Sequence, residues 1–232
     1  MRLSIMQPYL FPYIGYFQLM YVADRFVIYD DVNFINRGWI NRNRILVNQK
    51  PHLFTVPLKN ASQNTLIKDL KLAPIEKWKQ KFLRTLEFAY KKAPYFDTIF
   101  SIIYDVVNKK ATFLLDWHLE ALNRVINYLE IDTQIVETSS QYNNNDLKAN
   151  NRILDICVKE KAKNYINPIG GIELYSKQDF LKKGVNLFFL KSKDIHYRQF
   201  GDDFYSCLSI IDVMMFNSIT AINKMIKAYE LV

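Results

Sequence analysis

LSIMQPYLFPYIGYFQLMYVADRFVIYDD, residues 3–31, is the stretch that decides the fold. Its opening apolar run ends at Gln7-Pro8, which suits a buried strand that leads into a loop. Residues 15–23 then predict a helix, and Phe26–Tyr29 predict a second strand that ends in two aspartates. A β–loop–α–β unit of this kind begins a parallel sheet, so we expect an α/β fold.

The chain beyond this unit adds a hairpin, a helical stretch and further alternating units. NRNRILV and HLFTVPL predict two antiparallel strands, with Pro57 at an edge or strand end. From Pro74 to about Leu129 the apolar spacing predicts three helices. Strand, helix, strand, helix and strand are then expected at residues 134–138, 147–161, 164–167, 174–183 and 186–190, and one or two helices from residue 203 to about 229.

We therefore predict one domain, residues 1–232, with a Rossmann-like, mostly parallel sheet. Residues 1–60 would form an N-terminal β/α unit plus hairpin, residues 74–130 a helical insert, and residues 131–232 a second β/α half with C-terminal helices. Half of the residues are apolar and only six are Gly, which argues against disorder. Two closely joined lobes remain an alternative.

Cysteine, histidine and leader patterns limit the class of protein. Cys157 and Cys207 lie in segments that predict helices and form no CxxC pair, so free core thiols in a reducing cytoplasm are favoured over a disulfide. The three histidines match no ligand spacing, so no metal site is expected. The N-terminal apolar stretch is too short for a signal sequence, and no run approaches the roughly 18 residues of a membrane span. We expect a cytoplasmic protein without membrane insertion.

The formal charge of +8 favours an anionic partner. A phosphorylated small molecule, a nucleotide sugar, RNA and a lipid headgroup all fit this charge. The alternative is that the excess lysine only keeps an aromatic-rich protein in solution.

The densest polar and aromatic cluster is QPYLFPYIGY, residues 7–16. It lies where a strand is expected to end and a helix to begin, and ligands of parallel sheets bind at such strand ends. We expect Gln7, Pro8, Tyr9 and Tyr16 to line a pocket there, and Gly15 to permit close approach of the backbone. The alternative is a proline-rich turn that only connects strand to helix.

Asp30 and Asp31 follow the second strand at the same edge of the sheet. Either carboxylate would accept a hydrogen bond from a sugar hydroxyl or an ammonium group. Adjacent strand residues face opposite sides, and we favour Asp31. The alternative is an exposed turn or a cap.

RGWINRNR, residues 37–44, combines basic, amide and aromatic side chains. In an extended segment these side chains would present a phosphate-binding fork and an amide to a ligand, while the indole stacks on a base or sugar. The alternative is a basic surface hairpin anchored by its tryptophan. The candidate binding residues are Arg37, Trp39, Asn41, Arg42, Asn43 and Arg44.

The second half offers weaker candidates. NPIGGIELY repeats the arrangement of strand end and helix start, although such a glycine pair is more often structural. His196 is the one histidine near a loop that would act as a base, with a plain surface histidine as the alternative. The further candidate binding residues are Gly170, Gly171, Tyr175, Tyr197, Gln199, Ser209 and Asp212.

The string QPYLFPYIGYFQLMYVADRFVIYDDVNFINRGWINRNRI resembles the opening signature of the WbqC-like family. The later segments INPIGGIELY, YRQF and LSIID resemble weaker blocks of the same family, so the resemblance covers nearly the whole chain. PYIGYFQL also stands where HIGH-type nucleotidyltransferases and class I aminoacyl-tRNA synthetases, which share a HUP-like α/β fold, carry their motif. The histidines of that motif are absent here and no KMSKS-like loop is present, which argues against adenylation in the usual manner.

The family resemblance implies a role in bacterial polysaccharide biosynthesis, often of O-antigen. It implies a transferase that attaches glycine or another small acyl group to the amine of a nucleotide-linked amino sugar. An aminoacyl-tRNA, an acyl carrier protein thioester and ATP activation remain open as the donor. Asp31, His196 and Tyr16 are the candidate catalytic residues, and the arginines of residues 37–44 would hold phosphates. A DNA partner is not expected, and a homodimer is one alternative for the oligomeric state.

The alternative function is a non-catalytic protein that binds a nucleotide sugar or scaffolds the same pathway. It is favoured by the absence of a Ser-His-Asp set, a P-loop, a GxGxxG motif and a metal motif.

Overall fold

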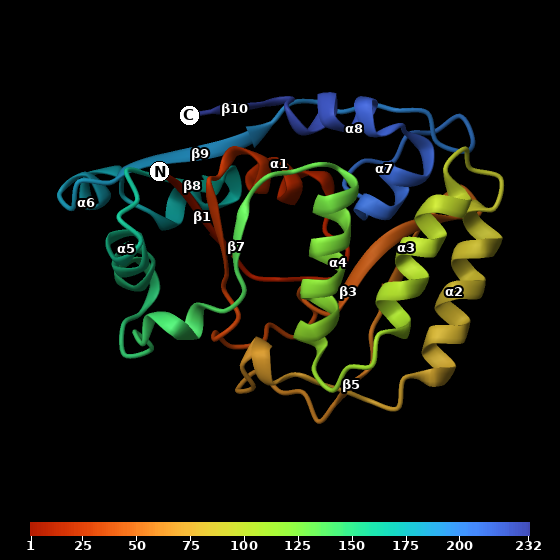
Figure 1. Ribbon diagram of the computed structural model, residues 1–232, viewed down its shortest axis with the longest axis horizontal. Helices are drawn as coiled ribbons and strands as arrows, with labels where there is room; N and C mark the ends of the chain where they lie inside the picture. The colour runs from red at the N-terminus through yellow and green to blue at the C-terminus, as the bar shows by residue number, and fades with distance from the viewer.

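The central sheet has six strands in the order β10-β9-β8-β1-β2-β7 in a computed structural model that describes all 232 residues (Figure 1). Only β10 runs antiparallel to its neighbour, and the other pairings are parallel. This sheet confirms the predicted α/β class and is compatible with a Rossmann-like fold. The strands are β1 (Arg2–Met6), β2 (Arg25–Ile28), β7 (Gln134–Val136), β8 (Asn164–Pro168), β9 (Asn186–Ser192) and β10 (Tyr229–Leu231).

The chain reverses its direction across the sheet after β7. It builds outward from β1 through β2 to β7, then crosses to β8 on the other side of β1 and continues to β9. Helix α1 (Ile14–Val22) connects β1 to β2, while α5 (Ala149–Lys159) and α6 (Lys177–Leu181) lie in the later crossovers. The carboxyl ends of β1 and β8 therefore flank the switch point, where open α/β sheets bind ligands.

The two faces of the sheet bury separate cores because side chains alternate along each strand. On one face, Val27 joins a smaller core that includes Ile153 of α5 and Phe180 of α6. On the other face, Phe26 and Ile28 join a larger core that also contains α1 and the helical insert. Helices therefore cover both faces, as a parallel sheet requires.

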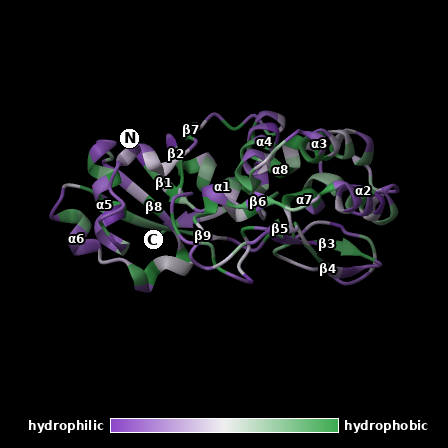
Figure 2. Cartoon of the chain, turned by 90° about the horizontal axis from the view of Figure 1, so that it is seen from below, coloured by the Kyte–Doolittle hydropathy of each residue, from purple (hydrophilic) through white to green (hydrophobic).

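The helical insert and the hairpin lie beside the sheet (Figures 1 and 2). Helices α2 (Glu76–Tyr90), α3 (Phe96–Asn108) and α4 (Leu114–Tyr128) make the insert, and α7 (Ile210–Phe216) and α8 (Ile219–Ile226) follow β9. Strands β3 (Arg42–Val47) and β4 (Lys50–Thr55) form the predicted antiparallel hairpin. Its two turn residues, Asn48 and Gln49, have φ of 49° and 60°, as a two-residue turn between twisted strands needs. Short strands β5 (Leu58–Lys59) and β6 (Lys71–Leu72) pair with each other.

The segment before α7 differs from the prediction. Residues 203–209 were expected to be helical, but the helix begins only at Ile210, and Cys207 is exposed with φ 56°. Arg44 donates to the carbonyl of Cys207 at 3.3 Å, so a side chain satisfies a group that a helix would have satisfied. The predicted core thiol is therefore wrong for Cys207 and confirmed for Cys157, which is buried in α5.

The other boundaries move by a few residues. The helix predicted over residues 174–183 is shorter, since a 3-10 segment, Ile169–Leu174, precedes α6. None of the helices has both the length and the apolar character that a membrane-spanning helix needs.

Candidate functional site

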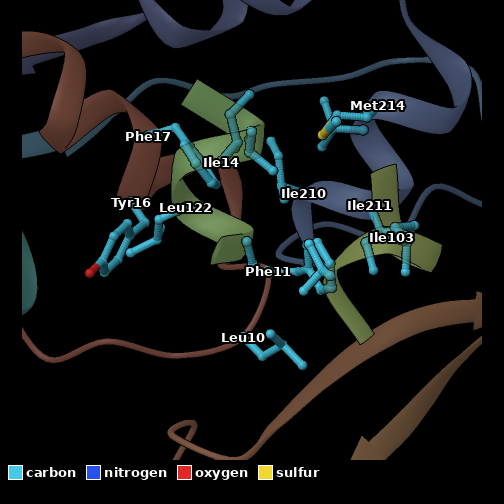
Figure 3. Close-up of a cluster of buried hydrophobic side chains, with 14 of the residues drawn as sticks. Leu10, Phe11, Ile14, Tyr16, Phe17, Ile103, Leu122, Ile210, Ile211 and Met214 are labelled. Atoms are coloured by element: carbon cyan, nitrogen blue, oxygen red, sulfur yellow. The ribbon is translucent and has the colours of Figure 1, made fainter. Parts of the chain in front are cut away.

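Side chains from distant segments hold the loop between β1 and α1. The amide of Asn43 donates to the carbonyls of Leu10 and Phe11, at 3.2 and 2.6 Å, and the hydroxyl of Ser209 donates to Phe11 at 2.7 Å. Phe11 adopts φ 47°, a left-handed conformation that these contacts stabilise. Its ring lies in the hydrophobic cluster that α1 and α7 share (Figure 3). Asn43 and Ser209, predicted to contact a ligand, thus position the loop instead.

A pocket of about 480 Å³ opens beside this loop, and we name it the α1–β9 pocket. Tyr13 and Ile14, at the start of α1, form one wall, and residues 192–197, from the last residue of β9 onward, form another. Residues 206–208 before α7 complete it. The first turn of α1 has no side-chain cap, and the N–H of Tyr16 bonds back to the carbonyl of Tyr13, so the N–H groups of Ile14 and Gly15 are the ones left for an anionic group.

Several reactive side chains line the α1–β9 pocket. His196 is exposed, and its ring packs on Phe204 with the centroids 4.7 Å apart. Lys193, Asp194 and the thiol of Cys207 are also exposed there. The pocket therefore offers a cation for a phosphate, an imidazole for proton transfer and a nucleophilic sulfur.

Tyr13 occupies the space that was predicted for a ligand beside Gly15. A Cβ atom at position 15 would overlap the ring of Tyr13, so glycine permits this ring to fold back along α1. Burial raises the pKa of Tyr13 above its usual value. Gly15 is thus explained by packing within the chain, and Tyr13 is the side chain that faces the pocket.

Asp212 is the centre of a buried hydrogen-bond network. Its carboxylate accepts from the hydroxyls of Tyr90 and Tyr197, both at 2.7 Å, and from the amide of Gln199 at 2.8 Å. Burial raises the pKa of Asp212. Gln199 and Asp212 are buried and paired, and of this network only Tyr197 lines the α1–β9 pocket. Substrate contact by Gln199 and Asp212 stays a prediction.

Of the predicted residues nearest the end of β1, some are buried or paired within the chain, and the side chain of Gln7 is not. Tyr16 is fully packed and donates to the carbonyl of Gln7 at 3.3 Å, and burial raises its pKa far above the usual value. Its hydroxyl is thus paired inside the chain, and its catalytic role stays a prediction. The hydroxyl of Tyr9 accepts a bond from the N–H of Tyr13 at 3.2 Å, and Pro8 is buried. Gln7 is half-buried at the switch point with no side-chain partner in the chain, and its ligand role stays a prediction.

Asp30, Asp31, Ser139 and Arg152 form what we call the closed cluster, at the ends of β2 and β7. Arg152 pairs with Asp31 at 2.5 Å, and both side chains are at most 6% exposed. Ser139 donates from its hydroxyl to Asp31 and from its backbone N–H to Asp30, the latter at 2.9 Å. Burial raises the pKa of Asp30. Asp31 is paired with Arg152 and is not a free carboxylate in this structure, and its role as the base stays a prediction.

The three arginines of residues 37–44 do not all lie at one place. Arg37, Asn41 and Arg42 line a hollow of about 270 Å³ beside Pro57. Arg44 lies elsewhere, over the ring of exposed Trp39 with its guanidinium 5.5 Å from the ring centroid. Arg37, Arg42 and Asn41 therefore meet at one hollow while Arg44 lies apart from it, and the binding of phosphates by these arginines stays a prediction.

The glycine pair after β8 has separate environments. Gly170 is exposed with open space around it, whereas Gly171 is buried against the amide of Asn167 and the ring of Tyr175. Tyr175 packs on Tyr165 with the ring centroids 6.1 Å apart. Gly171 and Tyr175 thus pack the end of β8, and Gly170 alone is free to meet a ligand.

The pocket residues that sequence reasoning missed include Tyr13, Lys193, Asp194 and Cys207. Tyr13 stood in the quoted motif, but nothing distinguished it from Tyr9 and Tyr16. Lys193 and Asp194 follow a predicted strand, which was a usable signal. Cys207 was assigned to a helix, and only its polar neighbours argued otherwise. No group of three or more His, Cys, Asp or Glu side chains is arranged to hold a metal ion.

Comparison with known proteins gives one family and one relative. The model of the WbqC-like protein family matches residues 7–224, which include the pocket, the hairpin and the closed cluster. A protein of Mycobacterium tuberculosis, described as uncharacterized protein Rv1507c, is 27% identical over 216 residues, which are 92% of this chain and 92% of that protein. No solved structure matches the chain, and the distant resemblance to HIGH-type synthetases stays a prediction.

Proposed function

The chain belongs to the WbqC-like protein family, and on that premise we propose that it is a transferase of bacterial polysaccharide biosynthesis. It attaches glycine or another small acyl group to the amine of a nucleotide-linked amino sugar. The observation that supports this most is the α1–β9 pocket. It brings an uncapped helix start, Lys193 and His196 together at the carboxyl edge of the sheet.

The proposed reaction forms one amide bond. The neutral sugar amine attacks the carbonyl carbon of the donor, a C–N bond forms, and the bond from that carbon to the carrier oxygen or sulfur breaks. His196 takes the proton from the attacking amine and returns it to the leaving group. The N–H groups of α1 and the ammonium of Lys193 hold the diphosphate. His196 thereby replaces Asp31 as the base.

The test uses UDP-glucosamine, whose amine is free, with three donors in separate reactions: glycyl-tRNA, a glycyl thioester, and glycine with ATP. Mass spectrometry should show the gain of one glycyl unit with one donor. His196→Ala should slow the reaction by about 10²- to 10⁴-fold. Lys183→Ala, an exposed change at the other edge of the sheet, should not.

A non-catalytic nucleotide-sugar-binding protein is the second candidate function. It is favoured by the burial of Asp31 and Asp212, which keeps these two carboxylates away from a bound substrate. Bound UDP-glucosamine whose mass stays unchanged with every donor would reject the transferase and leave this candidate.

A further inference from the structure

A second basic surface lies away from the α1–β9 pocket, between the hairpin and α2. Two hollows of about 450 and 240 Å³ share His52, Lys81 and Thr85, so they form one continuous groove. We call it the basic groove, and its outer lining residues are His52, Lys77, Lys81, Arg84, Thr85 and Phe88. No acidic side chain lines it.

The cations of the basic groove are exposed and unpaired. Lys77, Lys81 and Arg84 form none of the ion pairs of the chain, whereas the neighbouring Lys79 pairs with Glu76. They recur at spacings of four and three residues on one face of α2. At 1.5 Å per residue they follow one another by about 6 and about 4.5 Å along the helix axis. A row of free cations on a rigid helix suits a chain of phosphates.

Aromatic and apolar side chains accompany these charges. Phe88 is 65% exposed one turn beyond Arg84, and Leu53 on the facing strand is 45% exposed. Trp78 and Phe82 stack beneath, with ring centroids 4.8 Å apart. An exposed ring beside a row of cations provides a base-stacking platform beside a backbone-binding track, which is how single-stranded nucleic acid is bound.

We propose that the basic groove binds RNA, with Lys77, Lys81 and Arg84 on consecutive phosphates and Phe88 against an unpaired base. The net charge of +8 supports association with a polyanion. RNA binding stands apart from the transferase proposal because it is measured without any reaction. If both hold, the groove identifies aminoacyl-tRNA as the donor, held at a distance from the pocket.

The test is fluorescence anisotropy of the full chain with a labelled RNA hairpin that carries a short single-stranded 3′ end. Lys77→Ala/Lys81→Ala/Arg84→Ala should weaken binding at least tenfold and lower the slope of log Kobs against log salt by about 2. The control variant Lys163→Ala/Lys183→Ala/Lys224→Ala removes the same charge from exposed positions elsewhere. It should leave the RNA affinity and the salt slope nearly unchanged. Equal loss in the two triple variants would overturn the site.

Two further arms separate the remaining outcomes. Phe88→Ala should weaken binding of the RNA with the single-stranded 3′ end roughly tenfold and binding of a blunt hairpin only a little. An equal loss of affinity for both RNAs would reject the stacking role. Anionic phosphatidylglycerol vesicles serve as the competing polyanion. Binding to vesicles with no binding to the RNA hairpin would overturn the RNA assignment. RNA binding that persists while every donor fails in the transfer assay would reject the transferase and retain the groove.

Discussion

At the carboxyl edge of the sheet, the residues after β2 and β7 form the closed cluster, whereas the residues after β9 form the α1–β9 pocket. Both regions contain polar side chains and both follow parallel strands. In the closed cluster, Asp31 is paired with Arg152 out of solvent. In the pocket, His196 and Cys207 are exposed and unpaired. The comparison teaches that position at a strand end predicts polarity, and that burial decides whether the polar group is free for chemistry.

The strongest way to break the comparison is Arg152→Ala. It leaves Asp31 charged, buried and without its partner, which should lower the free energy of unfolding by about 3–5 kcal/mol. Arg124 pairs with Glu120 and Asp105 in partly exposed positions, and Arg124→Ala should lower the free energy of unfolding by about 1 kcal/mol or less. Urea unfolding of both variants measures the difference. Equal losses would show that the closed cluster contributes no more than a surface ion pair.

His118 and His196 extend the comparison of buried and exposed groups to the pH dependence of stability. His118 is buried, its Nε2 bonds the carbonyl of Ile40 at 2.9 Å, and burial lowers its pKa to about 3. The unfolded chain therefore takes up this proton before the folded chain does. The contribution of His118 to the free energy of unfolding is complete above pH 6.5 and falls as the pH drops below that value, by roughly 2 kcal/mol between pH 7 and pH 5.

Urea unfolding at pH 7 and pH 5 checks this expectation. His118→Gln retains a donor for Ile40 but does not titrate, so it should lose that part of the acid sensitivity. His196→Ala should keep it. A variant of His118 with the full wild-type pH dependence would assign the acid sensitivity to other groups.

The fold was more predictable than the site. Two short apolar runs and the strand ends at Gln7 and Asp30 were enough for the β–α–β unit, because apolar patterning and strand length are local properties. The hairpin of β3 and β4 followed from its turn and its alternation in the same way. The irregular segment around Cys207 was not predictable, because its backbone is held by Arg44, which is 163 residues away in the chain.

The surroundings of a site residue were not predictable where they depend on a distant partner. Asp31 and Asp212 carry the same carboxylate that a catalytic aspartate would, and their own neighbours in sequence do not reveal Arg152, Tyr90 or Tyr197. His196 was correctly placed near a loop, and the structure adds the pocket around it. Sequence thus proposes reactive groups, and tertiary contacts determine which of them stay accessible.

The smallest expected effect concerns the two thiols. Cys207→Ser changes an exposed side chain and should shift Tm by less than about 2 °C. Cys157→Ser places a hydroxyl in the core and should lower Tm by several degrees.

With 5,5′-dithiobis(2-nitrobenzoate), the folded chain should release one equivalent of thiolate dye through Cys207, since burial raises the pKa of Cys157 and blocks access to it. UDP-glucosamine should slow that reaction if it fills the pocket. Fast labelling of both thiols in the folded chain would show that the core around α5 opens as readily as the pocket.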